Sequence, residues 1–245
     1  MTYMVGIAGG SGSGKGTIAG LIRKNLEEFG LSSAILCTDN FYNDFSHLTE
    51  RERDDMCFNP EMNYDHPRSI DFARLLGLAN KLKNGEAFNY RKYNFNTHTY
   101  DADSEIGEVD ANLDIGIVEG NFALYNGSDV GKSSGFGDND LLELYDYKLF
   151  VTTSQVISLN RRLTRDRDER GRDVSHSQKQ ISSTVHPMYL RFIHPTSLYS
   201  DDQIKWENDL GCSPNDSDNK LNRLARQKAF TIYEAVRGKL SLGKK

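Results

Sequence analysis

Short apolar runs alternate with longer amphipathic stretches along the chain. Four runs have the length of a strand buried in a parallel sheet, over residues 4–8, 34–37, 115–118 and 147–151. Apolar residues three or four positions apart predict helices over residues 18–29, 72–82, 154–167, 175–193 and 221–236. This alternation is typical of an α/β domain in which helices flank a parallel sheet.

Weaker patterns predict further strands over residues 90–95, 105–109 and 204–206. Three more polar stretches, residues 43–63, 126–140 and 207–219, are expected to form loops, the first with room for a short surface helix.

Capping residues and prolines set the expected ends of the helices. Ser69 is placed to cap the helix over residues 72–82, and Gly85 lies just beyond its end. The helix that starts at Ser154 should end near Gly171. Pro187 should kink or interrupt the next one, because proline lacks the N–H that the helix needs.

A glycine-rich segment separates the first predicted strand from the first predicted helix. It reads Gly9-Gly10-Ser11-Gly12-Ser13-Gly14-Lys15-Gly16-Thr17. Backbone N–H groups of such a loop, the helix N-terminus and the lysine together attract a phosphate. The pattern G-x-x-x-x-G-K-[ST] fits except at Gly16, where a magnesium-binding hydroxyl is expected and comes one position later, at Thr17. The segment predicts a nucleotide phosphate site; the alternative is a glycine-rich turn without a ligand.

Two carboxylates follow predicted strands. Asp39 comes after the run over residues 34–37, and Glu119 directly after the run over residues 115–118. Functional groups gather at the carboxyl ends of strands in open α/β sheets, so both are expected to face the glycine-rich segment. Glu119 stands where P-loop enzymes often hold magnesium. Asp39 has an alternative role as the cap of a turn.

Three further segments carry candidate binding groups. Asp65 and His66 lie on a loop before the helix over residues 72–82, where a His-Pro pair is more often structural. Tyr93 and His98 are suited to stack on a planar base, or alternatively to pack within a hairpin. Arginines gather over residues 161–172, which suits a phosphate clamp. The alternative there is a solvated helix whose arginines pair with nearby acidic residues.

Length and composition narrow the class of protein. The 245 residues suit one α/β domain with a small appended lobe, and 37% hydrophobic residues are enough for a core. No apolar run reaches the length of a membrane span, and the chain enters a strand too early for a signal peptide. A net charge of -5 argues against a general nucleic-acid surface, and three cysteines without paired spacing fit a reducing cytoplasm. We therefore expect a cytoplasmic protein without a membrane or nucleic-acid partner.

The order of these motifs resembles the uridine kinase family, also called the uridine-cytidine kinases, of the P-loop kinases. The resemblance extends over about residues 4–201. It is carried by the glycine-rich segment and by residues 38–42, 63–67, 93–98, 118–120, 161–172 and 192–195.

The resemblance implies a P-loop NTPase-type parallel sheet flanked by helices, in one domain over residues 1–245. A small β-rich nucleoside-binding insertion would lie near residues 86–110 and an arginine-rich lid near residues 161–180. The implied reaction transfers phosphate from ATP, with Mg²⁺, to the 5′-hydroxyl of uridine or cytidine, and the family is often homo-oligomeric.

Roles for single residues also follow from the resemblance. Asp39 resembles the carboxylate that takes or orients the 5′-hydroxyl proton, and Asp65 resembles the ribose ligand. Lys15, Arg165 and Arg170 resemble catalytic groups on the phosphates, and Asp39 and Glu119 resemble the metal ligands. The remaining nucleoside-binding positions implied are Tyr42, Tyr64, Tyr93, His98, Arg162, Arg172 and Gln180.

The chain departs from the family pattern at several positions. Gly16 removes a hydroxyl, so magnesium should be held by phosphate oxygens, water, Asp39 and Glu119. Asn94 replaces a common Asp, and Tyr100 stands where a basic residue is common. The Gly-Lys-Gly-Thr sequence is similar to that of nucleoside monophosphate kinases.

Three other functions remain open at this point. They are a nucleoside monophosphate kinase, a phosphoribulokinase-like or pantothenate kinase-like enzyme, and a catalytically silent nucleotide-binding protein. Asp39 argues against the first, because a hydroxyl acceptor benefits from a base whereas a phosphate acceptor is already an anion.

Overall fold

The computed structural model describes residues 1–95, 97–100, 104–127, 140–207 and 220–242. Within these ranges, five strands form a parallel sheet in the order β2-β5-β1-β6-β7. The strands are β1 (Tyr3–Gly9), β2 (Ser33–Cys37), β5 (Ile115–Gly120), β6 (Tyr147–Thr152) and β7 (Asp202–Lys205). The four main apolar runs are thus confirmed as strands, and the parallel α/β fold class is confirmed with them.

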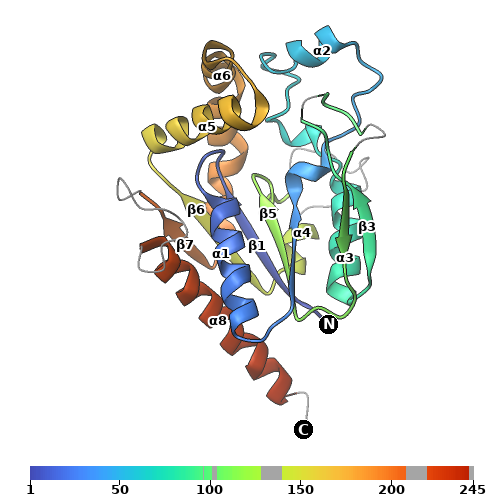
Figure 1. Cartoon of the computed structure of the whole chain (residues 1–245), viewed down its shortest axis with the longest axis vertical. Helices are drawn as coiled ribbons and strands as arrows, with labels where there is room; N and C mark the ends of the chain where they lie inside the picture. The colour runs from blue at the N-terminus through green and yellow to red at the C-terminus, as the bar shows by residue number, and fades with distance from the viewer. Residues whose placement is uncertain (96, 101–103, 128–139, 208–219, 243–245) are drawn as a thin grey trace.

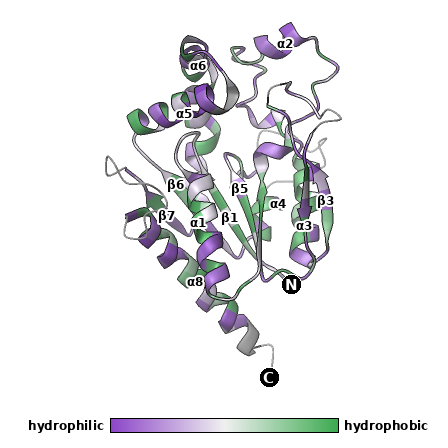
Figure 2. Ribbon diagram, viewed as in Figure 1, coloured by the Kyte–Doolittle hydropathy of each residue, from purple (hydrophilic) through white to green (hydrophobic). Residues whose placement is uncertain are grey.

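Helices cover both faces of the sheet (Figure 1). On one face α1 (Lys15–Glu28) and α8 (Lys220–Leu242) bury residues such as Ile18, Ile22 and Ile232 against the strands. On the other face lie α3 (Phe72–Asn84) and the short α4 (Asp140–Leu144). Figure 2 shows hydrophobic colour along the central strands of the parallel sheet and hydrophilic colour over α2 (Glu50–Asp55), which buries no residue.

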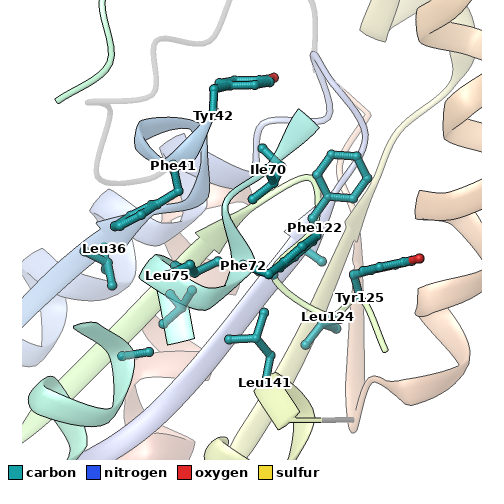
Figure 3. Packing of buried hydrophobic residues seen from close by; sticks show 14 of the residues in the cluster. Leu36, Phe41, Tyr42, Ile70, Phe72, Leu75, Phe122, Leu124, Tyr125 and Leu141 are labelled. Atoms are coloured by element: carbon teal, nitrogen blue, oxygen red, sulfur yellow. The ribbon is translucent and has the colours of Figure 1, made fainter. Parts of the chain in front are cut away.

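The hydrophobic core on the α3 face of the sheet extends to the carboxyl ends of β2 and β5. Figure 3 shows Phe41, Phe72 and Phe122 gathered with Leu36 and Leu75 in this cluster. Phe41 closes a 3-10 turn over Thr38–Phe41 that directly follows β2. Burial of the Phe41 ring anchors this turn. The turn positions Asp39 at the edge of the sheet.

The small antiparallel sheet differs in its bounds from the prediction. It consists of β3 (Phe88–Arg91) and β4 (Ile106–Val109), whereas the sequence pattern extended the first strand to residue 95. Beyond β3 the chain turns, and Asn94 bridges back to Thr99. Tyr93 is nevertheless buried, at 5% exposure, because it packs among other aromatic rings outside the strand. The aromatic side chain of Tyr93 therefore fits the sequence pattern of a strand, although its backbone does not pair with β4.

Helix caps confirm some boundaries and correct others. Gly85 and Gly171 end α3 and α5 (Gln155–Arg170) with φ of 75° and 60°, and Ser154 caps the start of α5. The predicted cap Ser69 is wrong, since Asp71 accepts the N–H of Arg74 at the start of α3. The Ser69 hydroxyl instead lies 2.7 Å from the carbonyl of His66 within a preceding turn.

The helix predicted over residues 175–193 is a succession of shorter helices. It consists of α6 (Val174–Gln180), a π-helical segment Ile181–Val185, α7 (His186–Met188) and a second π-helical segment Tyr189–Ile193. Pro187 lies between the two π segments. Wider turns accommodate a proline that cannot donate to the regular ladder, so the predicted interruption is confirmed in this form.

Among the residues that the structure describes, no helix combines the length and the apolar character needed to span a bilayer.

Gly120 controls how closely β5 approaches the Asp39 turn, and we predict that Gly120→Ala destabilises the protein. Its φ is 152°, and an added Cβ would lie 1.7 Å from the Thr38 hydroxyl oxygen. The expected loss is about 1–3 kcal/mol, measured by urea denaturation.

The matched control is Gly77→Ala on the exposed side of α3, where an added Cβ meets nothing within 4 Å. That variant should gain about 0.5–1 kcal/mol, because alanine is the better helix former. Equal effects of the two substitutions would contradict the account.

Candidate active site

The phosphate loop, residues 9–17, joins β1 to α1 in a conformation that depends on glycine. Gly12 and Gly14 have φ of 76° and 91°. A Cβ at Gly12 would lie 2.2 Å from the carbonyl oxygen of Ser158, and one at Gly14 would lie 2.0 Å from the ring of Trp206. The loop is closed by a bond from the Ser13 N–H to the Gly10 carbonyl. Its position at the N-terminus of α1 makes it an anion site.

Helix α5 lies beside this loop (Figure 1). Three of its side chains hydrogen-bond to the loop. The Ser158 hydroxyl donates to the carbonyl of Ser11 at 3.0 Å, and Arg162 Nη1 donates to Ser11 Oγ at 2.8 Å. Arg161 Nη1 lies 3.4 and 3.3 Å from the carbonyls of Gly12 and Ser13. The loop is therefore held from outside by side chains about 150 residues away in sequence.

Arg161 and Trp206 form a stack beside the loop that the sequence analysis did not assign. The guanidinium lies 3.7 Å from the centre of the indole ring. Trp206 is held at the end of β7 by a bond from its N–H to the Thr152 carbonyl. Arg161 belongs to the arginine cluster, but no sequence pattern indicated that a tryptophan 45 residues later would cover Gly14.

Most of the predicted site residues line one narrow cavity of about 40 Å³ at the carboxyl edge of the sheet. Twelve of the fourteen lining residues were predicted: Ser11, Lys15, Asp39, Tyr42, Tyr64, Asp65, Tyr93, His98, Arg162, Arg165, Arg172 and Gln180. The other two are Phe95, which belongs to the segment predicted to stack on a base but had no role of its own, and Asn121, which was missed. Asn121 follows Glu119 at a strand end, so the rule that selected Glu119 also pointed to it. The side chain of Arg170 lies outside the described part.

A buried carboxylate organises the arginines of this cavity. Asp166 is fully buried, with Arg162 Nε 3.2 Å from its Oδ2 and Arg165 Nη2 3.1 Å from its Oδ1. On the other side, Gln180 Oε1 accepts from both Arg162 and Arg172, each at 3.3 Å. Among the described side chains of this helix, the alternative of exposed ion pairs fits Arg167 and Asp168, which pair on the surface.

Asp65 faces the same cavity with little access to solvent. It is 7% exposed, and its Oδ2 lies 2.9 Å from the hydroxyl of Thr184. Burial raises the pKa of Asp65, while the nearby Arg162 and the Thr184 hydroxyl oppose that rise. Its neighbour His66 has a structural place, with Nδ1 accepting the Arg68 N–H and its ring edge-on to Phe192.

Aromatic rings form the wall opposite the arginines. Tyr64 and His98 are stacked, with ring centres 4.3 Å apart and planes at 15°, and Tyr93 packs against Tyr42. His98 Nε2 lies 3.3 Å from Arg172 Nη2. The hydroxyl of Tyr100 donates 2.8 Å to the carbonyl of Tyr42, which ties this wall to the turn that carries Asp39.

Glu119 lies beside the phosphate loop in a position suited to a metal. Burial raises its pKa, and the charge of Lys15 opposes the rise. Its Oε2 is buried without a hydrogen-bond partner in the described chain. A Cβ on Gly16 would lie 3.9 Å from both carboxylate oxygens, so the missing side chain leaves space in front of them. Within the described ranges no group of three or more His, Cys, Asp or Glu side chains that could hold a metal ion occurs.

The arginine cluster supports a prediction about stability. Asp166→Ala should lower the free energy of unfolding by about 3–5 kcal/mol, because it leaves two arginines without their buried partner. Asp168→Ala on the same helix removes only an exposed pair and should change it by less than about 1 kcal/mol. Urea denaturation of both variants tests this, and similar small effects would contradict a structural role for Asp166.

Comparison with known proteins identifies the family of this chain. Residues 4–209 match the model of the phosphoribulokinase / uridine kinase family. A uridine kinase from Staphylococcus aureus (strain JH9) is 41% identical over 200 residues, which cover 82% of this chain and 86% of that protein.

Two solved structures share the fold. Phosphoribulokinase from Rhodobacter spheroides aligns with a TM-score of 0.59 and 15% identity, over 89% of this chain and 75% of that one. A possible uridine kinase from Bacillus stearothermophilus aligns with a TM-score of 0.50 and 16% identity, over 83% of this chain and 88% of that one. The family match and the 41% identical relative each span most of the sequence, so this chain belongs to the phosphoribulokinase / uridine kinase family.

Proposed function

We propose that the protein transfers the γ-phosphate of ATP to the 5′-hydroxyl of uridine or cytidine. The observation that carries the proposal is the lining of a single cavity by Ser11 and Lys15 of the phosphate loop and by Asp39 and Asp65. The first pair suits a phosphate donor and the second pair suits hydroxyls. The 41% identity to a uridine kinase supports the same conclusion.

The donor half uses the phosphate loop and the arginines. Backbone N–H groups of residues 9–17 surround the β- and γ-phosphates, and Lys15 adds a positive charge. Arg165, together with Arg170, stabilises the charge on the migrating phosphoryl group. Phosphoryl transfer depends mainly on positioning and charge stabilisation, so these groups form a sufficient set.

The donor base has its own candidate partners. We place it against Arg161 and Trp206, because both lie beside the loop and present planar groups on which a base stacks. The two are in contact at 3.7 Å, so a base that enters between them must separate them.

The acceptor half uses the two aspartates and the aromatic wall. Asp39 accepts the proton of the 5′-hydroxyl, and Asp65 accepts hydrogen bonds from the ribose 2′- and 3′-hydroxyls. Tyr93 and His98 contact the pyrimidine, with Tyr42 and Tyr64 beside them and Arg162, Arg172 and Gln180 around the nucleoside. The cavity of about 40 Å³ is far below the ~300 Å³ at which ligand sites begin. Acceptor binding must therefore separate lining groups such as the stacked Tyr64 and His98.

Mg²⁺ fits the carboxylates of Asp39 and Glu119 as an addition to phosphate and water oxygens. When bound, the ion neutralises charge on the phosphates. Gly16 leaves the space in front of Glu119 open, so a hydroxyl at that position is replaced by water or phosphate.

The wider organisation completes the proposal. Residues 86–110 act as the nucleoside-binding insertion and residues 161–180 as a lid within one domain over residues 1–245. A homo-oligomer in the cytoplasm is proposed on the basis of the family resemblance.

A parallel assay separates this function from its rivals. Uridine, cytidine, uridine monophosphate, ribulose 5-phosphate and pantothenate are each offered with MgATP, and transferred phosphate is measured. Transfer to uridine or cytidine alone supports the proposal. Transfer to uridine monophosphate, which Gly16 and Thr17 favour, would support a monophosphate kinase, and no transfer to any acceptor would support a silent nucleotide-binding protein.

Removing the carboxylate charge at position 39 should slow the reaction. Asp39→Asn should reduce kcat by about 10²–10⁴-fold, the usual contribution of general base catalysis, while uridine binding is retained. The exposed Asp44→Asn, five residues away, is the control and should leave kcat near normal. Near-normal turnover by Asp39→Asn would exclude the proposed role.

The raised pKa of Asp65 predicts weaker acceptor binding in acid. Protonation removes the negative charge that accepts the ribose hydroxyls, and it begins at a higher pH than for an ordinary aspartate with a pKa of about 3.9. The KM for uridine should rise as pH falls through the raised pKa, while the KM for ATP stays constant. Asp65→Asn should have a high uridine KM that no longer depends on pH in this range; an unchanged pH profile in that variant would contradict the assignment.

Trp206 is the only tryptophan in the chain, so its fluorescence reports on the proposed donor-base site. A non-hydrolysable ATP analogue should change the emission in a saturable way, because the base displaces Arg161 from the indole. Uridine alone should have little effect. An emission spectrum that is constant at saturating nucleotide would place the base elsewhere.

A further inference from the structure

A second and larger cavity borders the phosphate loop, and most of its lining residues have no role in the proposed reaction. This rear cavity has a volume of about 310 Å³. Its floor includes Gly10 and Ser13, one wall is α5, and the opposite wall is the chain between Ile181 and His194. Lys15, Asp39 and Trp206 are absent from its lining, so it is separate from the proposed acceptor and donor-base sites.

Its interior combines apolar side chains with one aromatic face. Leu159, Val185 and Leu190 contribute the apolar surface. The ring of Tyr189 lies over Gly10, where an added Cβ would be 2.8 Å from it. Such a lining favours a flat ligand that buries both faces.

Polar side chains add hydrogen-bonding capacity. Gln155 and His194, which are exposed, and His186, which is half-buried, line the rear cavity. The imidazole of His186 is stacked near Tyr189, with ring centres 6.5 Å apart, and that of His194 is edge-on to the same ring at 5.7 Å. An amide and two imidazoles supply both donors and acceptors, which matches the edge of a nitrogen heterocycle.

The wall opposite α5 owes its shape to the two π-helical segments on either side of Pro187. Val185 ends the first and Tyr189 begins the second, so both lining residues stand at places where the helix widens. π-helical turns are rare and occur frequently at functional sites. Here they flank Pro187, which accounts for the widening, and they shape the wall that a ligand would contact.

Two residues connect the rear cavity to the proposed active site. Ser11 and Arg162 line both cavities and are joined by the 2.8 Å bond from Arg162 Nη1 to Ser11 Oγ. A ligand on one side of this shared wall changes the positions available to the same side chains on the other side. Coupling of this kind is reciprocal for binding free energies.

We propose that the rear cavity is a regulatory site that binds a planar nitrogen heterocycle of nucleobase type and alters the affinity of the acceptor cavity. The binding half is independent of the proposed function. The regulatory half rests on that function, because it names the acceptor site whose affinity changes.

The binding test uses the free bases adenine, cytosine and uracil, which carry no hydroxyl to be phosphorylated. Each is titrated into the full chain in the presence of saturating uridine and a non-hydrolysable ATP analogue, and binding is followed by ligand-detected NMR. At least one base should bind. Val185→Trp should weaken that binding by about tenfold or more, since the larger ring fills the cavity.

Two further variants keep this test decisive. Leu190→Trp acts at the exposed rim of the cavity, so it gives the same expected loss if Val185→Trp fails to fold. Val156→Trp, an exposed position on α5 outside the lining, is the matched control and should bind like the parent. Absence of binding by all three bases, or equal binding in all variants, would overturn the proposal. Loss of binding in Tyr93→Ala alone would assign the base to the acceptor cavity instead.

The regulatory half has a separate readout. The base that binds should change the KM for uridine in the parent protein and leave it unchanged in Val185→Trp. If uridine is phosphorylated and the base binds without changing this KM, coupling is excluded while the binding site stands. If no acceptor is phosphorylated, the proposed function fails, and the binding titration still decides whether the site exists.

Discussion

The buried carboxylate of Asp166 is the interaction on which the arrangement of the site depends. It fixes Arg162 and Arg165 from one side, and Gln180 holds Arg162 and Arg172 from the other. A buried charge without partners is costly, so the arginines and the carboxylate are stable in the interior only together. Because Arg162 also binds Ser11, this one cluster ties the helix that carries the arginines to the phosphate loop.

The parallel sheet explains why the other groups meet there. β1, β2 and β5 are neighbours and all run in the same direction, so the phosphate loop, Asp39 and Glu119 emerge at one edge. The aromatic core beneath this edge, with Phe41 and Phe72, supports the turn after β2 and keeps Asp39 in place. The Tyr100 hydroxyl adds a hydrogen bond to the carbonyl of Asn40 in the same turn. The functional edge is therefore rigid where the carboxylates stand and is closed by side chains that must move for a nucleoside to enter.

The strands, the helices and many residues of the site could be predicted from the sequence, because local sequence patterns determine them. Apolar periodicity predicted the strands and helices of the sheet layers, and the rule about strand ends selected Asp39 and Glu119. The resemblance to a family selected most of the residues that line the narrow cavity. The cap of α3 was wrong because Ser69 and Asp71 are both good caps, and only the turn before the helix decides between them.

Other features depend on contacts that no local pattern encodes. Trp206 covers Gly14 only because β7 lies beside β6, and Thr184 reaches Asp65 only through the widened helix near Pro187. Burial of Asp166 likewise follows from how α5 packs on the loop and α6. The two π-helical segments flank Pro187, which is a local signal, but the rear cavity also needs α5 as its second wall.

The central claim is that phosphate moves from ATP to the 5′-hydroxyl of a pyrimidine nucleoside. The most direct measurement is a ¹H–³¹P correlation NMR spectrum of the product formed from uridine and MgATP. The new phosphorus is expected to couple to the two 5′ protons of the ribose. Coupling to the 2′ or 3′ proton, or formation of free phosphate without a nucleotide product, would contradict it.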